Sequence, residues 1–495
     1  MKLKFLPLFV LGLALSACNT PTVTPTEDPT EDPTVTPTKD PTEESVFDEN
    51  NIIIHAPLFS DEHCERTSPI NSSEQTTNGI KKFVNLVGRD EFDIWLSAGD
   101  RSLTGTIAAD EEWYNAYKNG CEDSVDKLFF CHGNHDVYWT GCASRAEHYN
   151  YFNTLGLFDE DEKDSRPNAG NRHKVVNGVD FLTIDITTYD GKTNPISAGT
   201  KEWADYVLST LDKTKPVIVL AHATAKNTIL GSNDYEAYGV WGSSKDLYEL
   251  VKKYPNVILF TGHTHYDCHS EKNIWQGDFT AINVPTVSGG MVIDTYYNGL
   301  QTPEYEFEGT NIVYKNSGWI ESFPETEDPK YSSSQCMYVE IDKNYNTRVT
   351  RYDLKNNVQI GRPWVIEAPK DDNSHLLKYN LENRLLTDEA PEERGSATYS
   401  IDANGKITVN FDSFYHKDMV YAYELQVFLD IPKEDLEDRD EPDERYVFME
   451  EYYKTYPVPS SHTYTFRRTY SDNYVVRIVG IDSLGKYGIV YPTQV

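Results

Sequence analysis

The sequence predicts an α/β domain followed by a small all-β sandwich. Between about residues 50 and 290, short runs rich in β-branched residues alternate with segments whose apolar residues recur at helical spacing. Several of these runs end at an aspartate, asparagine or histidine, as strands do at the ligand-binding edge of an α/β sheet. From about residue 392, runs of alternating apolar and polar residues recur regularly, which is typical of a β-sandwich. A length of 495 residues is consistent with two or three domains.

The first residues have the pattern of an export signal. Lys2 and Lys4 precede an apolar run at residues 5–15 that is too short to span a membrane. The following Leu-Ser-Ala-Cys18 resembles a bacterial lipoprotein signal, in which cleavage precedes Cys18 and this cysteine receives the lipid. The alternative is a plain secretory signal with Cys18 as a spare thiol. We expect residues 1–17 to be the signal peptide and the protein to be extracytoplasmic, anchored to a membrane through Cys18.

Residues 18–48 are expected to be a tether. Pro-Thr repeats with Glu and Asp fill residues 20–44, and only Val23 and Val35 are apolar there. Such a segment is extended and solvated. The net charge of the whole chain is -34, which argues against a basic surface for binding nucleic acid.

The elements of the α/β region are expected in order along the chain. An apolar run at residues 51–59 is the first strand, and Pro57 suggests that it bends or ends early. Further strands are expected at residues 92–98, 127–134, 173–176, 180–185, 216–220 and 257–260, with Asn177-Gly178 as a hairpin turn. Apolar residues at helical spacing predict helices at residues 70–88, 111–118, 201–211 and 246–253.

Later strands complete the predicted architecture. Residues 283–293 and 335–353 suggest a second sheet that closes the α/β domain, which we expect to span residues 49–354. Residues 355–391 resemble a linker with a short ordered part. Residues 392–495 are expected to form the β-sandwich, which is similar to a fibronectin type III module in the stretch Val479 to Gly485.

Six cysteines follow Cys18 in the chain. No C-x-x-C pair occurs among them, so a structural zinc site is disfavoured, and buried thiols or one or two disulfides are expected instead. These residues are Cys64, Cys121, Cys131, Cys142, Cys268 and Cys336.

Five predicted strands are followed by short blocks of potential metal ligands. In chain order these blocks are Asp61-Glu-His63, Gly99-Asp100, Gly133-Asn134-His135-Asp136, His222 and Gly262-His263-Thr-His265. A single D-x-H or a lone histidine is weak on its own and occurs often on surfaces. That all five blocks lie at predicted strand ends by chance is much less favoured than a common metal site.

Together the five blocks resemble the calcineurin-like metallophosphoesterase family over about residues 50–354. The resemblance implies a two-sheet metallophosphoesterase sandwich flanked by helices. Two departures from the family pattern stand out. Leu103 occupies a place where the family often has Asp or Asn, and His55-Ala-Pro57 lies inside the first strand.

The resemblance also implies two adjacent divalent or trivalent metal ions, with manganese, iron and zinc suited to such ligands. The implied ligands are Asp61, His63 and His265 for one ion, Asn134, His222 and His263 for the other, and Asp100 as a bridge. A metal-bridging hydroxide would attack phosphorus. His135 would bind phosphate or protonate the leaving oxygen, and Asp136 would orient His135.

These observations predict an exported, lipid-anchored hydrolase acting on a phosphodiester, or on a phosphomonoester. The alternative is a catalytically inactive surface protein for binding or adhesion on the same fold. The C-terminal module is expected to take a cell-surface glycan or protein ligand. Four aromatic residues are candidates for the lining of a substrate pocket, although core positions are the commoner role at such spacings: Trp113, Tyr138, Trp139 and Trp241.

Overall fold

The computed structural model describes residues 46–67, 71–158, 170–186, 194–230, 232, 243–288, 305–308, 311–314, 334–429, 442–449, 458–469, 474–484 and 486–495. The predicted signal peptide with Cys18, most of the predicted tether and Trp241 lie outside the described residues. Within these ranges, no helix is both long enough and apolar enough to cross a membrane.

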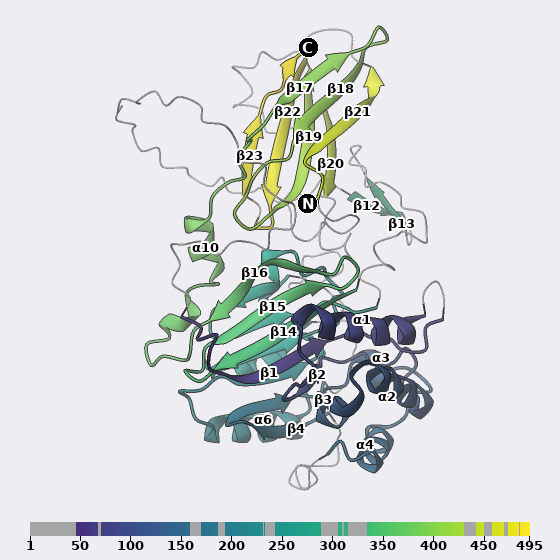
Figure 1. Ribbon diagram of the computed structural model, residues 1–495, viewed down its shortest axis with the longest axis vertical. Helices are drawn as coiled ribbons and strands as arrows, with labels where there is room; N and C mark the ends of the chain where they lie inside the picture. The colour runs from purple at the N-terminus through teal and green to yellow at the C-terminus, as the bar shows by residue number, and fades with distance from the viewer. Residues whose placement is uncertain are drawn as a thin grey trace, which may run out of the picture. The chain divides into compact units, whose positions relative to one another are not determined.

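Two six-stranded sheets form the α/β region (Figure 1). The first has the order β16-β15-β14-β1-β2-β3, and its strands are β1 (Ile52–Phe59), β2 (Trp95–Ser97), β3 (Leu128–Phe130), β14 (Gln335–Asp342), β15 (Thr347–Asp353) and β16 (Val358–Ile366). The second has the order β10-β11-β9-β6-β5-β4, and its strands are β4 (Arg172–Val176), β5 (Val179–Thr183), β6 (Val217–Ala221), β9 (Val257–Thr261), β10 (Ile274–Gln276) and β11 (Thr280–Asn283).

The centre of each sheet is parallel. In the first sheet β1, β2 and β3 run parallel, whereas β14, β15 and β16 add antiparallel strands beyond β1. In the second sheet β5, β6, β9 and β11 are parallel, with antiparallel β4 and β10 at the edges. The carboxyl ends of parallel strands meet at one edge of a sheet, so residues that follow these strands are brought together.

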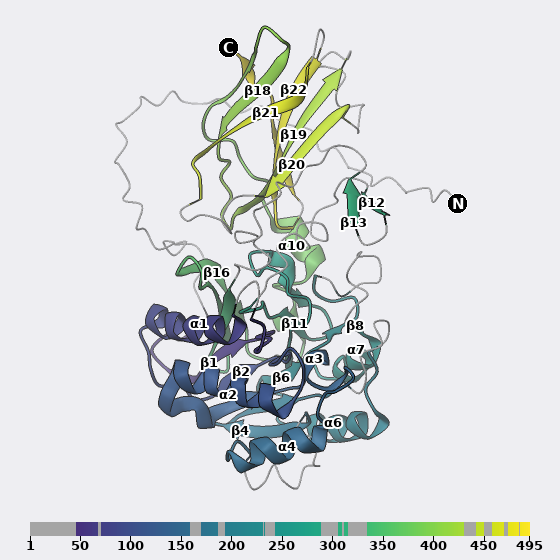
Figure 2. The ribbon, with the colours of Figure 1, turned by 90° about the vertical axis from the view of Figure 1, so that its right-hand side faces the viewer.

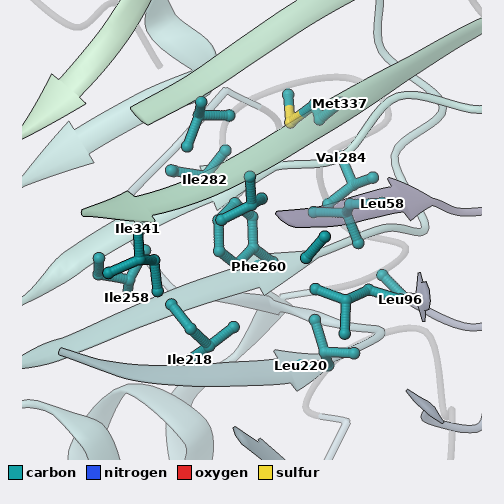
Figure 3. Close-up of a cluster of buried hydrophobic side chains, with 14 of the residues drawn as sticks. Leu58, Leu96, Ile218, Leu220, Ile258, Phe260, Ile282, Val284, Met337 and Ile341 are labelled. Atoms are coloured by element: carbon teal, nitrogen blue, oxygen red, sulfur yellow. The ribbon is translucent and has the colours of Figure 1, made fainter. Parts of the chain in front are cut away.

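The main hydrophobic core lies between the two sheets (Figure 3). Leu58 and Leu96 from the first sheet face Leu220 and Phe260 from the second, and all four side chains are fully buried. Alternate residues of each strand point into this core, because successive side chains of a strand project to opposite faces.

Helices cover the outer faces of both sheets (Figure 2). Apolar side chains of α1, α2 and α4 pack on the first sheet, and those of α6 and α7 pack on the second. The helices are α1 (Ser72–Val87), α2 (Ile107–Cys121), α3 (Asn134–Val137), α4 (Arg145–Thr154), α6 (Ala198–Thr210), α7 (Lys245–Val251) and α10 (Leu381–Thr387), with short 3-10 helices at Glu122–Lys127, Glu271–Asn273 and Ser374–Leu376. The predicted α/β class with flanking helices is therefore confirmed.

Local signals in the sequence explain several boundaries. Asn71 caps the start of α1 by accepting a hydrogen bond from Glu74 N, and Gly88 ends the helix in the left-handed region. Asn177 and Gly178 both have positive φ, as the hairpin between β4 and β5 requires. The first strand continues through Pro57 to Phe59, contrary to expectation, because pairing with β2 begins only after the proline.

The first sheet also extends beyond residue 354. β16 pairs with β15 and lies in the segment that the sequence suggested was a linker. Two minor strand pairs are present in the α/β region as well: β7 (Thr224–Ala225) with β8 (Ser243–Ser244), and β12 (Tyr305–Glu308) with β13 (Asn311–Tyr314).

The C-terminal region contains two four-stranded sheets that share one hydrophobic core. Their orders are β21-β18-β17-β24 and β20-β19-β22-β23, with β17 (Ala397–Ile401), β18 (Lys406–Asp412), β19 (Val420–Leu429), β20 (Glu444–Met449), β21 (Ser461–Thr469), β22 (Tyr474–Asp482), β23 (Tyr487–Val490) and β24 (Thr493–Gln494). This arrangement is a small β-sandwich, as predicted. Its similarity to a fibronectin type III module stays a prediction.

Candidate active site

The predicted ligand blocks lie at the carboxyl ends of strands from both sheets. Asp61 and His63 follow β1, Asp100 follows β2, and Asn134 and His135 begin α3 just after β3. The second sheet contributes His222 directly after β6, and His263 and His265 after β9. The two sheets thus face each other with their ligand-bearing edges aligned.

Four of these side chains form a first cluster, made of Asp61, His63, Asp100 and His265. Their ligand atoms all lie within 4.8 Å of one another. His265 Nε2 is 3.0 Å from Asp61 Oδ1 and 3.1 Å from His63 Nε2. His63 Nε2 is 3.9 Å from Asp100 Oδ2, a separation too long for a hydrogen bond but suitable for two ligands of one ion.

A second cluster consists of Asp100, His222 and His263. His222 Nε2 lies 3.2 Å from Asp100 Oδ2 and 3.2 Å from His263 Nδ1. Asp100 belongs to both clusters, as a bridging ligand would. Its Oδ2 atom faces the imidazoles of both clusters, whereas Oδ1 accepts a hydrogen bond of 2.8 Å from His135 N. Asp100 would therefore be the residue shared by the two ions.

The donor set fits a pair of metal ions. Carboxylates and imidazoles are the ligands that manganese, iron and zinc take in such sites. Asn134 Oδ1 is buried and has no hydrogen-bond partner among the described residues. A buried amide oxygen without a partner costs free energy, and a cation would satisfy it.

The backbone at the site is strained. Left-handed φ is uncommon for residues other than glycine and costs of order 1 kcal/mol or more each. Five of the predicted ligands nevertheless have positive φ: Asp61 (52°), His63 (45°), Asp100 (52°), His263 (71°) and His265 (56°). Such strain persists where the surrounding structure holds it in place, and it concentrates at functional sites.

Two glycines allow the loops to approach one another. A Cβ atom on Gly133 would lie 2.1 Å from Asp100 Oδ1 and 2.3 Å from Asp100 N. A Cβ atom on Gly262 would lie 2.0 Å from Ser60 Oγ and 2.6 Å from Asp61 Oδ2. The glycines of the G-N-H-D and G-H-T-H blocks are therefore needed for close packing of the ligand loops.

Opposite charges across the site shift its pKa values strongly. Although burial opposes ionisation, His265 and His222 hold the pKa of Asp61 well below its usual range. His222 and His135 do the same for the pKa of Asp100, again against burial. Burial lowers the pKa of His222, but Asp100 and Asp61 outweigh it and raise that pKa to about 9. Without metal, a proton on His222 balances the carboxylates, so metal binding must displace that proton.

The contacts of His135 correct one prediction. His135 Nδ1 lies 3.0 Å from the main-chain oxygen of Leu103 and can donate to it. Asp136, expected to orient His135, instead accepts hydrogen bonds from Gly133 N and from Ser102 N, and pairs with Arg101. Asp136 therefore stabilises the turn around Gly133, and the main-chain oxygen of Leu103 orients the His135 ring.

A buried network behind Asp136 was not predicted from the sequence. Arg101 Nη1 is 3.3 Å from Asp136 Oδ2, and Arg101 Nη2 is 3.3 Å from Asp110 Oδ1. His148 completes the network through Asp110 and through a 2.9 Å hydrogen bond to Asp136 O. All four side chains are fully buried. The only signal in the sequence was the position of Arg101 directly after Asp100.

The other residues singled out in the sequence differ in exposure. Trp113 is fully buried in the core, whereas Tyr138 and Trp139 are exposed near His135. The six cysteines beyond Cys18 are free thiols, four of them buried, and none joins the clusters of potential ligands in the described residues. The zinc-ligand and disulfide alternatives for these cysteines therefore receive no support.

Comparison with known proteins agrees with this geometry. Residues 58–267 match the sequence profile of the family described as calcineurin-like phosphoesterase, and the match includes all seven predicted metal ligands. None of the curated proteins compared with the chain matches it. The crystal structure of phosphopantetheinyl hydrolase from Mycobacterium tuberculosis is similar at 14% identity over 49% of this chain and 93% of that chain, with a TM-score of 0.32, which is too low to add support. Residues 58–267 therefore form a calcineurin-like phosphoesterase domain, the domain of a family of metal-dependent phosphoester hydrolases.

Proposed function

We propose that the protein is an exported, lipid-anchored phosphoesterase that hydrolyses phosphodiesters. The observation that carries the hydrolase proposal is the gathering of Asp61, Asp100 and four histidines from strand ends of both sheets into two clusters that share Asp100. Export and the lipid on Cys18 are supported by the apolar run and the Leu-Ser-Ala-Cys18 block. In our proposed division of the exported part, the first domain begins at residue 49 and includes β16, and residues 392–495 form the second domain.

The ligands fit two cations. Asp61, His63 and His265 would hold one, Asn134, His222 and His263 the other, and Asp100 would contact both. When bound, the ions would supply Lewis acidity toward phosphoryl oxygens and activation of water. Manganese, iron and zinc suit this ligand set.

The residues of the chain would then complete the reaction. In hydrolysis, a water oxygen forms a bond to phosphorus, the ester P–O bond breaks, and the departing oxygen takes up a proton. His135 is placed to give that proton. Because its Nδ1 faces Leu103 O, only Nε2 is left to exchange a proton with a substrate.

The test compares two substrates under controlled metal. The purified protein would be assayed with bis-p-nitrophenyl phosphate and with p-nitrophenyl phosphate, each with added manganese and with chelator. Hydrolysis of the diester that occurs with manganese and stops with chelator supports the proposal. Turnover of the monoester alone would redirect it to phosphomonoesters. Two bound metals per chain without turnover of either ester would favour the alternative, a surface binding protein whose C-terminal module takes a glycan or protein ligand.

A further inference from the structure

Two aromatic side chains beside His135 have no role in the chemistry described so far. Tyr138 and Trp139 follow α3 directly, and they are 43% and 47% exposed. The ring centroid of Trp139 lies 5.8 Å from that of His135 and 5.4 Å from that of Tyr138. Exposed aromatic surface is costly in water, so a pair beside a reacting group suggests a binding surface.

Tyr138 and Trp139 lie on a turn that is stabilised by main-chain hydrogen bonds. Tyr138 N donates to Asn134 O at 3.0 Å, and Cys142 N donates to Trp139 O at 3.1 Å. Gly105 packs against the same turn, where it accepts a 2.7 Å hydrogen bond from Ala143 N. A Cβ atom on Gly105 would lie only 2.4 Å from the main-chain oxygen of Asp136, and its φ of +65° also favours glycine. The turn is therefore ordered before any substrate arrives, which reduces the entropy cost of binding.

The His135 ring contacts both the metal ligands and the aromatic pair. Its centroid is 4.7 Å from that of His63, one of the predicted ligands, in an edge-to-face arrangement. It is also the ring next to Trp139. A phosphoryl group bound at the ligand clusters, with its leaving oxygen at His135, would therefore place the rest of the leaving group near Trp139.

From this arrangement we infer that Trp139, assisted by Tyr138, forms the leaving-group subsite and selects esters whose leaving alcohol carries a planar ring. A nucleoside and an aryl alcohol are the two sources of such a ring. The inference rests on the proposed phosphoesterase function and names its substrate class. Stacking of a planar ring on an aromatic side chain is worth about 1–3 kcal/mol, and about 1.4 kcal/mol corresponds to a tenfold change.

The first experiment locates the subsite with two diesters that share the p-nitrophenolate leaving group. The second ester group, which stays on phosphorus after hydrolysis and is called the retained arm below, is also a ring in bis-p-nitrophenyl phosphate. In methyl p-nitrophenyl phosphate it is a methyl group. We expect Trp139→Ala to lower kcat/KM for both esters alike, by about tenfold and mainly through KM. A loss confined to the bis ester would place Trp139 against the retained arm and overturn the inference.

Two variants serve as controls. Trp139→Phe keeps a ring and should retain most of the wild-type kcat/KM. Tyr206→Ala removes an aromatic side chain that is 70% exposed on α6, which carries none of the predicted ligands, and should leave both esters unaffected. An unchanged kcat/KM in Trp139→Ala would also overturn the inference, while turnover by the wild type would keep the proposed function.

The second experiment does not need turnover. Phenylphosphonate and methylphosphonate are stable to hydrolysis, and calorimetry of the manganese-loaded full chain would give their affinities. We expect the wild type to bind phenylphosphonate about tenfold more tightly and Trp139→Ala to bind both equally. Equal affinities in the wild type would overturn the inference. If the wild type hydrolyses neither ester but shows the expected preference, the proposed catalysis fails and the aromatic subsite stands.

Discussion

The main-chain oxygen of Leu103 lies 3.0 Å from His135 Nδ1 and orients the ring that would meet the leaving group. The family pattern often has Asp or Asn at this place, whereas here the contact comes from the main chain of a leucine. Since the backbone supplies it, the side chain at position 103 is free to vary without loss of ring orientation. The same geometry leaves Nε2 as the only nitrogen of His135 available to a substrate.

Replacing His135 should separate chemistry from metal binding. His135→Ala removes the proton donor, so we expect kcat to fall by about a hundredfold or more. Bound metal should be retained, because the main-chain N of residue 135 still donates its hydrogen bond to Asp100 Oδ1 and so keeps Asp100 in place. Metal analysis with single-turnover kinetics checks this prediction. His173→Ala, at a half-exposed histidine of β4, is the control and should behave as wild type. Full turnover by His135→Ala would refute the assigned role.

Replacing Asp100 should remove activity and metal together. Asp100 is shared by both clusters, and an amide in its place lacks the negative charge and binds a cation more weakly than a carboxylate. We therefore expect Asp100→Asn to lose turnover and to hold fewer metal ions per chain, as measured by elemental analysis. Asp278→Asn, at an exposed carboxylate that accepts from Tyr248 OH, should change neither quantity. An Asp100→Asn protein with full turnover would contradict the shared-ligand scheme.

Close packing at Gly133 predicts a steric defect. A methyl group there meets both the side chain and the main-chain nitrogen of Asp100, so rotation of one side chain cannot relieve the clash. Gly133→Ala should lower the metal content and destabilise the fold by about 1–3 kcal/mol. Gly141→Ala is the matched control, since its φ is +103° but a Cβ atom there would meet nothing within 4 Å. Equal effects of the two substitutions on metal content would argue against the packing explanation.

The buried cation Arg101 predicts a large loss of stability. Arg101→Met would leave the carboxylates of Asp136 and Asp110 without their shared partner. Breaking a buried ion pair costs about 3–5 kcal/mol, measurable by urea denaturation. Arg394→Met removes an exposed pair with Glu392 and should cost less than about 1 kcal/mol. Near-equal stabilities of the two variants would show that the Arg101 network does not stabilise the fold.

A carboxylate pair gives the C-terminal region a pH-dependent stability. Burial and the neighbouring Asp388 raise the pKa of Asp482 to about 7. An unfolded aspartate titrates near 4, so between about pH 4 and 7 the folded state binds more protons and its stability falls as pH rises. His416 contributes in the same direction, because Asp388 and Asp482 raise its pKa against the effect of burial.

Asp482→Asn should flatten this dependence. The amide keeps the Oδ1 acceptor for Leu484 N and Lys486 N but no longer ionises. Hydrogen exchange of β19 and β22 at pH 5 and pH 8 would measure the effect. We expect the wild type to lose more protection at pH 8 than the variant does. A wild-type sandwich equally protected at both pH values would contradict the assignment.

The sequence could predict which candidate ligands lie close together, because strand ends are local features. Each block follows an apolar run, and the packing of the two sheets brings Asp61 and His265 together across about two hundred positions. The helices were also predictable, since their apolar faces repeat at helical spacing.

What could not be predicted depends on contacts between distant segments. Nothing local distinguishes the buried Trp113 from the exposed Trp139, because exposure is decided by what packs against each side chain. The pairing of β16 with β15 was missed because residues 358–366 include a glycine and a proline, which weaken a strand pattern. The partner of Asp136 was assigned from adjacency in the chain, whereas the fold brings Arg101 to it.

The five predicted ligands with left-handed φ have a consequence for engineering the protein. Each one makes the metal-free chain less stable than glycine would at the same position, by about 1 kcal/mol. Glycine at these positions would therefore stabilise the chain and, in the same step, remove donors from both clusters. Selection of variants for stability alone would lead away from the set of residues that can hold metal.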